Sequence, residues 1–194
     1  MFGEILNRQG ERLDYTLHPG QDDDKLVILG HGVTGNKDRP FVVALAEGLC
    51  AAGMGGAVGV LRSSSDGRIR LLVSLAGMVH TEAFAQREFG EETPNAGLMW
   101  EDEECPLSHS YMDDMAQIGS VVGLADRIKV PWLFVHGTED DVVPPQDTLD
   151  IMAVAPGEVQ LLELPGADHV FSDNATAPMV GGVVAWLSKQ LHGE

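Results

Sequence analysis

The sequence predicts an α/β fold in which a shortened, mostly parallel sheet is flanked by helices. Three observations support this class. Short apolar runs closed by glycine or polar loops alternate with stretches of helical periodicity, which is typical of helices wrapped around a parallel sheet. The 194 residues fit a single domain spanning 1–194 and can bury a core. A composition of 44% hydrophobic and 22% charged residues is that of a globular protein.

The composition also narrows the partners and the compartment. Acidic residues outnumber Lys and Arg by 30 to 12, so the formal charge of -18 would repel a polyanion, and we expect no nucleic-acid partner. The N-terminal ten residues lack the features of a signal peptide, and no apolar run reaches the roughly 18 residues of a membrane span. Cys50 and Cys105 fit no metal-binding spacing, which favours a reduced compartment, although a disulfide stays open. We therefore expect a cytoplasmic protein without a membrane partner.

The N-terminal quarter contains a hairpin, a strand and a helix. Apolar and polar residues alternate after the turn at Arg8–Gly10, so Glu4–His18 is predicted to be an antiparallel hairpin. The continuous apolar run Leu26–Leu29 predicts a strand buried on both faces. Asp38, as an N-cap before an early proline, begins a helix that runs to Leu49.

The rest of the chain continues the alternation. The predicted elements are a helix start at 57–62, a strand at 69–76, a helix at 111–128, a strand at 131–135, a helix at 146–154, a strand at 159–164 and a helix at 177–191. Residues 78–106 show no clear periodicity, and with the following helix they are predicted to form a lid or cap-like insertion at about 78–128. We expect a sheet of about five or six strands.

Polar side chains follow three of the predicted strands. His31, in a Gly-rich loop that continues to Asp38, follows the first strand, Asp140 follows the strand ending near Val135, and His169 follows the strand ending near Leu164. The carboxyl ends of parallel strands meet at one edge of a sheet, where the loops converge on a site. We therefore expect these three residues to lie close together, with the acid preceding the histidine on successive loops.

These loops together resemble the α/β-hydrolase superfamily, and in particular its small-ester hydrolases and carboxylesterases. The resemblance implies that Asp140 orients the imidazole of His169 and stabilises its cation, while His169 acts as general base and then acid. It also implies that the amide of Val33 faces the developing oxyanion. By the same resemblance His31 shapes its loop rather than taking part in the chemistry.

The nucleophile of that family is missing from this chain. No Gly-x-Ser-x-Gly occurs in the sequence, and Met54–Val60 resembles only the half of the nucleophile elbow that follows the serine. Gly53 then stands at the serine position, Met54 would supply the second oxyanion amide, and Cys50 is a weak substitute nucleophile. The nearby serines are interpreted as structural: Ser63, Ser64, Ser65, Ser74, Ser108 and Ser110. We infer a deletion of a few tens of residues that removed two inner strands and the serine.

Three functional interpretations follow from these residues. The first is a serine-type ester hydrolase by descent, with small acyl or aryl esters as substrates. The second is an inactive hydrolase-like binding module, or a chain shortened by natural truncation, by an artefact of splicing or gene prediction, or by engineering. The third, metal-assisted hydrolysis by His31, Asp140 and His169, lacks any helical His pair or metal-ligand spacing. We expect a small-molecule ester as partner, no cofactor and no metal, and a homodimer that covers the surface left by the lost strands.

Overall fold

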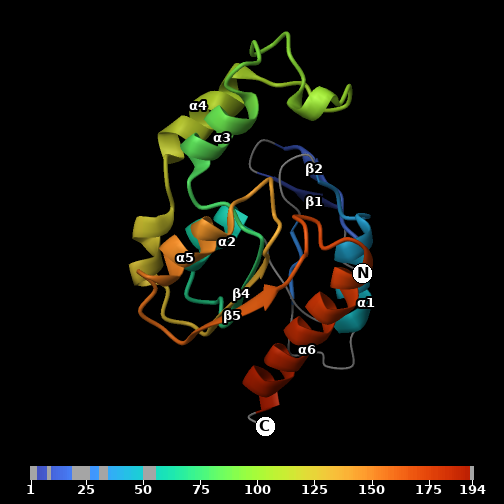
Figure 1. Ribbon diagram of the computed structural model, residues 1–194, viewed down its shortest axis with the longest axis vertical. Coiled ribbons are helices and arrows are strands. Elements are labelled where there is room, and N and C mark those ends of the chain that lie inside the picture. Colours follow the sequence, from blue (N-terminus) through green and yellow to red (C-terminus); the bar gives the residue numbers. More distant parts are fainter. Residues whose placement is uncertain (1–3, 8–9, 19–26, 31–34, 50–55, 193–194) are drawn as a thin grey trace.

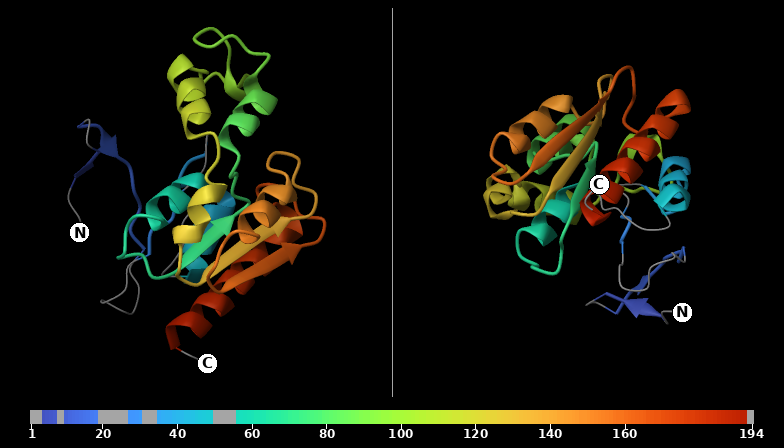
Figure 2. Two further views of the ribbon diagram at one scale, coloured as in Figure 1. Left: turned by 90° about the vertical axis from the view of Figure 1, so that its left-hand side faces the viewer. Right: turned by 90° about the horizontal axis from the view of Figure 1, so that it is seen from below.

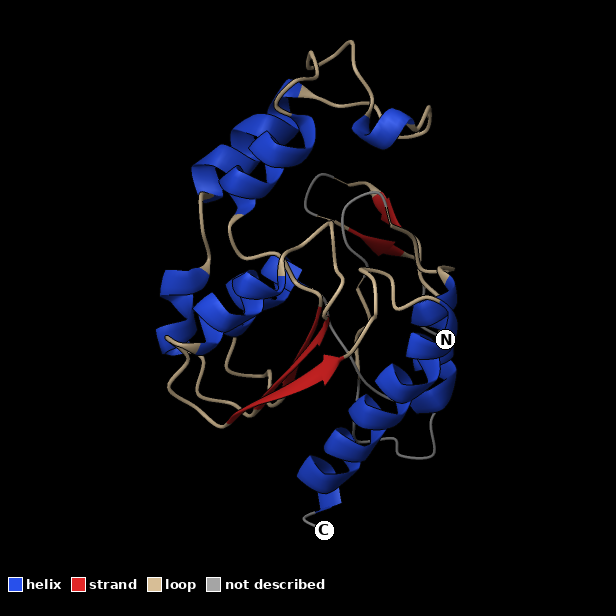
Figure 3. Ribbon diagram, in the orientation of Figure 1, coloured by secondary structure: helices blue, strands red, loops and turns tan. Residues whose placement is uncertain are grey.

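A parallel sheet lies between two helical layers in the computed structural model, which describes residues 4–7, 10–18, 27–30, 35–49 and 56–192 (Figures 1 and 3). Its strands are β3 (Leu72–Leu75), β4 (Trp132–Gly137) and β5 (Val159–Leu164), in the order β3-β4-β5. Both pairings are parallel, and Trp132 lies opposite Leu72 on one side and Val159 on the other. The predicted α/β class is confirmed.

Helices α1 (Pro40–Leu49) and α6 (Thr176–His192) cover one face of the sheet (Figure 1). Alternate residues of the strands, among them Val73 and Val135, face this layer because successive side chains of a strand point to opposite faces. The cluster they form with the two helices is fully apolar: Leu45, Val73, Ala76, Leu133, Val135, Leu164, Ala167, Phe171, Met179, Val183, Trp186 and Leu187. This layer fixes the sheet against the C-terminal helix.

The opposite face is covered by three shorter elements, α2 (Gly56–Ser63), α5 (Pro145–Met152) and the 3-10 helix η2 (Val122–Arg127). Trp132 and Phe134 point to this side and stack with ring centroids 4.4 Å apart. His136 is the next residue in the same alternation, so it enters the same buried layer beneath α5.

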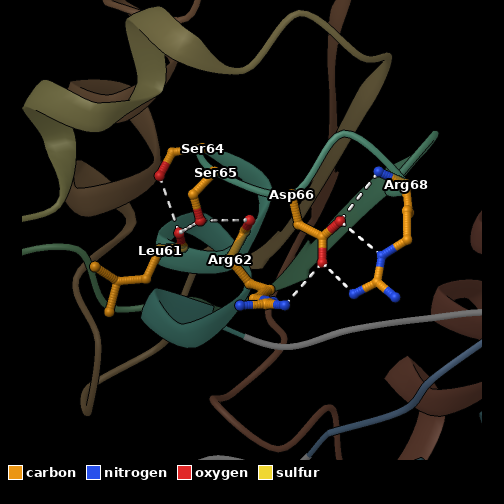
Figure 4. Close-up of polar contacts among 6 residues, drawn as sticks. All are labelled: Leu61, Arg62, Ser64, Ser65, Asp66 and Arg68. Carbon is orange, nitrogen blue, oxygen red and sulfur yellow. Dashed lines mark hydrogen bonds and ion pairs between the residues drawn. The ribbon is translucent and has the colours of Figure 1, made fainter.

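The connection from α2 to β3 is a polar turn (Figure 4). The hydroxyls of Ser64 and Ser65 donate to the carbonyl of Leu61, and Asp66 pairs with both Arg62 and Arg68. The hydrogen bonds and charge of Arg68, with the nearby charge of Arg62, lower the pKa of Asp66 below its ordinary range. These two serines thus close a turn, as the sequence predicts.

Residues 81–118 form a cap that stands apart from the sheet (Figures 1 and 2). It contains α3 (Thr81–Phe89), the short 3-10 helix η1 (Met99–Glu101) and α4 (His109–Ile118). The prediction of an irregular segment over 78–106 is wrong for α3, whose buried residues Thr81, Phe84, Ala85 and Phe89 have helical spacing. The predicted continuous helix over 111–128 is also wrong. It ends at Gly119, which adopts φ +66° as the chain leaves the cap.

The two segments that connect the cap to the rest of the domain, one before α3 and one after α4, run side by side. The N–H of Val121 donates to the carbonyl of Val79, and the buried carboxylate of Asp147 on α5 accepts from the N–H groups of Val79 and His80. The His80 ring in turn lies 2.9 Å from Asp150 through Nε2. The hinge of the cap is therefore attached to α5.

The N-terminal segment forms the predicted antiparallel hairpin, shortened to β1 (Ile5–Leu6) and β2 (Arg12–Leu13). It is set apart from the main sheet (Figure 2). Residues 27–30, the described part of the strand predicted at Leu26–Leu29, are not in a strand, and the described residues form a main sheet of three strands rather than five or six. A strand needs a hydrogen-bonded neighbour, and the described residues provide none for 27–30.

Candidate active site

The loops after β4 and β5 meet at the carboxyl edge of the sheet. Thr138 donates its backbone N–H to Leu164, and Glu139 donates to Ala167. Gly137 makes this approach possible, because a Cβ at that position would lie 2.2 Å from the carbonyl oxygen of Ala167. The backbone contacts thus hold the two loops together before any side chain is considered.

Asp140 and His169, predicted from the sequence to act together, are in contact. Nδ1 of His169 lies 2.9 Å from Oδ2 of Asp140. The Asp140 side chain is 0% exposed, whereas that of His169 is 32% exposed. Because an ionised carboxylate only accepts hydrogen bonds, Nδ1 of His169 carries a proton, and Nε2 is left as the nitrogen that can accept one from a reacting group.

The second oxygen of Asp140 is held by the backbone of its own loop. Oδ1 accepts from the N–H of Val142 at 3.0 Å and from the N–H of Val143 at 2.8 Å. Burial opposes ionisation, but hydrogen bonds from His136, His169 and Val143 outweigh it and lower the pKa of Asp140 well below its ordinary value. The carboxylate is therefore charged at neutral pH and correctly placed to stabilise an imidazolium at His169.

His136 is a third member of this cluster that the sequence reasoning missed. Its Nε2 lies 3.1 Å from Oδ2 of Asp140 and 2.9 Å from the carbonyl oxygen of Val143, and its Nδ1 lies 2.7 Å from Oγ1 of Thr148. The side chain is 2% exposed. The sequence did contain a signal for it. His136 shares a strand face with the apolar Trp132, so its side chain is expected to be buried. A buried polar group needs a partner, and Asp140 lies only four residues further on.

The remaining predicted site residues cannot be placed. Cys50, Gly53 and Met54 lie outside the described residues, and so do His31 and Val33. The predicted nucleophile position and oxyanion hole therefore stay predictions.

Of the other serines that the sequence suggests as structural, Ser74, Ser108 and Ser110 have hydrogen-bond partners within the fold, whereas the hydroxyl of Ser63 is buried without a partner among the described residues. Ser74 is buried and accepts a hydrogen bond from the indole of Trp132 at 3.1 Å. Ser108 caps α4 by accepting from the N–H of Tyr111, and its hydroxyl lies 3.1 Å from that of Ser110. Neither arrangement places a hydroxyl beside His169.

Cys105 lies in the cap, where desolvation and the neighbouring charge of Asp102 raise the pKa of its thiol above the ordinary value. A raised pKa disfavours the thiolate that a nucleophile requires. Among the residues that the structure describes, no group of three or more His, Cys, Asp or Glu side chains is arranged to hold a metal ion. Nor does any helix of the described segments have the length and apolarity needed to cross a membrane.

Comparison with known proteins places this site in a family. The model of the prolyl oligopeptidase family matches residues 55–194, which include α2, the whole sheet, the cap and both loops of the site. The chain belongs to the prolyl oligopeptidase family.

Curated relatives include the uncharacterized protein YfhR of Salmonella typhi, 25% identical over 167 residues, and that of Salmonella typhimurium, 24% identical over the same length. Each alignment covers 86% of this chain and 48% of the relative, so the chain spans about half the length of these relatives.

The solved structures that resemble the chain are α/β-hydrolases. Est1E from Butyrivibrio proteoclasticus has a TM-score of 0.73 and 18% identity, covering 89% of this chain and 91% of Est1E. The esterase domain of a Rhodothermus marinus protein has a TM-score of 0.72 and 13% identity, with 97% of each chain covered. Est1E has also been solved with bound ferulic acid, and that structure matches with a TM-score of 0.73 and 16% identity over 96% of this chain and 93% of Est1E. At these identities the likeness shows the α/β-hydrolase fold.

Proposed function

We propose that the chain is a serine-type ester hydrolase by descent whose site is built for small acyl or aryl esters. The observation that carries the proposal is the 2.9 Å contact between His169 Nδ1 and the buried, ionised Asp140 at the carboxyl edge of the sheet. In this arrangement His169 can take a proton at Nε2, and Asp140 stabilises the charge that results. Within this class, an ester of a small aromatic acid is supported by the ferulic acid bound to Est1E.

The missing element is the group that His169 would activate. The sequence contains no Gly-x-Ser-x-Gly, and the position that matches the serine is Gly53. We attribute this to the loss of a segment between Cys50 and Met54. Turnover by this chain then depends on a water molecule activated directly by His169, or on the weak substitute Cys50.

The test is hydrolysis of 4-nitrophenyl acetate and methyl ferulate by the purified chain. His169→Gln removes the base, and His18→Gln is the matched control because His18 is exposed and belongs to the segment after β2. We expect slow turnover that His169→Gln abolishes and His18→Gln preserves. Equal rates in the parent chain and in His169→Gln would overturn catalysis by this chain.

The alternative is a hydrolase-like module that binds an ester or its acid without cleaving it, and the absent serine motif favours it. This version gives saturable ferulate binding in calorimetry with no burst of product. Covalent labelling by a fluorophosphonate would contradict it, since that reagent needs an activated nucleophile. Mass spectrometry of the labelled peptide would then identify the group, with residues 50–56 as the first place to look.

A further inference from the structure

A hydroxyl, an imidazole and a carboxylate are in contact away from Asp140 and His169. At the cap hinge, Oγ of Ser120 lies 3.2 Å from Nδ1 of His80, whose Nε2 contacts Asp150. The neighbouring amides are already used, because Val121 donates to Val79 and Val122 donates to Ser120 itself. Without a free donor to stabilise an oxyanion, this chain of contacts has a structural role. The buried contacts of His136 support a role in the site itself.

From these contacts we infer that His136 is a positioning residue for Asp140, held by Thr148 as the neutral tautomer with its proton on Nε2. This inference rests on the proposed role of Asp140 as the acid of a hydrolase site. By this inference β4, through His136, and α5, through Thr148, help to position the acid, in addition to the loops after β4 and β5.

The contacts of the ring decide between its two neutral tautomers. Nε2 faces two acceptors, the carboxylate of Asp140 at 3.1 Å and the carbonyl of Val143 at 2.9 Å, so this nitrogen carries a proton shared between them. Nδ1 faces the hydroxyl of Thr148 at 2.7 Å, which can donate to it. A proton on Nδ1 alone would leave Nε2 with its lone pair against two oxygens, and that state is repulsive.

A neutral His136 serves Asp140 in a way that a cation would not. With donors from His136, His169, Val142 and Val143, the carboxylate has filled the roughly four lone-pair sites that it offers. The donor from a neutral ring fixes Oδ2 without cancelling its charge. The full negative charge then remains available to His169 when that ring takes up a proton.

The same proton also fixes the loop. By donating to the carbonyl of Val143, His136 holds the residue whose own N–H donates to Oδ1 of Asp140. One buried ring therefore restrains both oxygens of the acid, one directly and one through the backbone. Thr148 orients the ring, so a hydroxyl on α5 controls the geometry of a site that it does not touch.

The first test is a spectrum of the full chain labelled with ¹⁵N-histidine, with His136 assigned from the signal lost in His136→Gln. We expect Nε2 protonated and Nδ1 unprotonated at pH 7.5. In Thr148→Val the Nδ1 signal should move downfield because the nitrogen no longer accepts a hydrogen bond, and Thr148→Ser should restore it. A His136 ring protonated on both nitrogens, or an Nδ1 signal that is the same in Thr148→Val and the parent chain, would overturn the inference.

A second measurement reads the effect on Asp140 by carbon NMR of its carboxyl group. His136→Leu removes the donor, and the titration midpoint should move upward by about one pH unit, because a hydrogen bond to a charged group contributes on that scale. His136→Gln keeps an amide donor near Oδ2 and should move it less. An unchanged midpoint in His136→Leu would count against positioning.

Neither measurement needs turnover, so the two proposals can fail separately. If the chain hydrolyses no ester, the NMR results on His136 and Asp140 are unaffected. If the chain is active but His136 is protonated on both nitrogens, the ester hydrolase proposal stands and the inference on His136 is overturned. If His136→Leu fails to fold, the Thr148→Val and Thr148→Ser pair still decides the tautomer.

Discussion

Replacing Asp140 by Asn tests whether the carboxylate holds this edge of the sheet together. The amide keeps one oxygen for the N–H groups of Val142 and Val143, but its NH₂ group faces the rings of His136 and His169. Two hydrogen bonds to a buried charge are lost, each contributing about 1.5–3 kcal/mol, and a change of tautomer at His169 recovers one of them. We therefore expect the free energy of unfolding to fall by about 2–4 kcal/mol.

Urea denaturation at pH 7 measures this loss. With a slope of about 2 kcal/mol per molar urea for a domain of this size, the midpoint should fall by about 1 to 2 M. Asp141→Asn is the matched control, since the Asp141 side chain is exposed and should leave the midpoint unchanged.

The pH dependence gives the same prediction a second check. The pKa of Asp140 is depressed in the folded state, so its contribution is complete above the unfolded value of about 3.9 and is lost as the pH falls toward the folded value. Asn does not titrate. The difference between parent and Asp140→Asn should therefore be constant above about pH 5 and narrow by about 1 kcal/mol at pH 3. A difference that stays constant down to pH 3, or a loss under about 0.5 kcal/mol at pH 7, would refute the assigned hydrogen bonds.

Two further substitutions probe how the site and the cap are attached. Gly137→Ala places a Cβ 2.2 Å from the carbonyl oxygen of Ala167, so the loops after β4 and β5 must separate; we expect a loss of about 2 kcal/mol in urea and a weakened low-field proton signal of the His169 ring. His80→Phe removes the contact with Asp150 at the cap hinge; amide exchange within 81–118 should quicken about fivefold, equivalent to about 1 kcal/mol, while Lys189→Gln on α6 changes nothing.

The sequence predicted those features that depend on neighbouring residues along the chain. The strands before Asp140 and His169 are short apolar runs that end in glycine or polar loops, and parallel strands bring such loops together. Strand order placed these two residues at one edge of the sheet, and the resemblance of their loops to those of the α/β-hydrolases predicted that they are in contact. Helix α1 was equally visible, because an N-cap and an early proline mark where it begins.

What the sequence could not show depends on contacts between distant segments. Helix α3 is only nine residues long, so its helical spacing extends over few residues, and Phe84 and Phe89 pack within the cap, whose other members are distant in sequence. His136 sits in an otherwise apolar strand, and its partner Thr148 is twelve residues away on another element. The predicted number of strands also depended on long-range pairing. Residues 27–30 have no strand partner among the described residues, and a run of apolar residues alone cannot show whether such a partner exists.

The acid loop is held from two sides, and both supports lie within the matched family region. On the side of the sheet, His136 donates to the carbonyl of Val143. On the side of the cap, the side chain of Val143 packs into the apolar cluster of the cap, and Arg87 donates to the carbonyl of Val142. Displacing the cap would therefore pull on the residues whose N–H groups bind Oδ1 of Asp140. The position of the cap and the geometry of Asp140 are therefore coupled through Val142 and Val143.

This arrangement explains how the acid and base can keep their geometry in a chain without the nucleophile motif. The contacts described for Asp140 come from residues 136, 142, 143 and 169, none of which belongs to the segment around Gly53. Inserting a strand and a serine elbow between Cys50 and Met54 should then add a nucleophile to an acid–base pair that is already in place. Its effect would be large on turnover and small on the loss of stability caused by Asp140→Asn. If the loss of stability caused by Asp140→Asn changed several-fold on that insertion, the geometry of the pair would instead depend on the inserted strand.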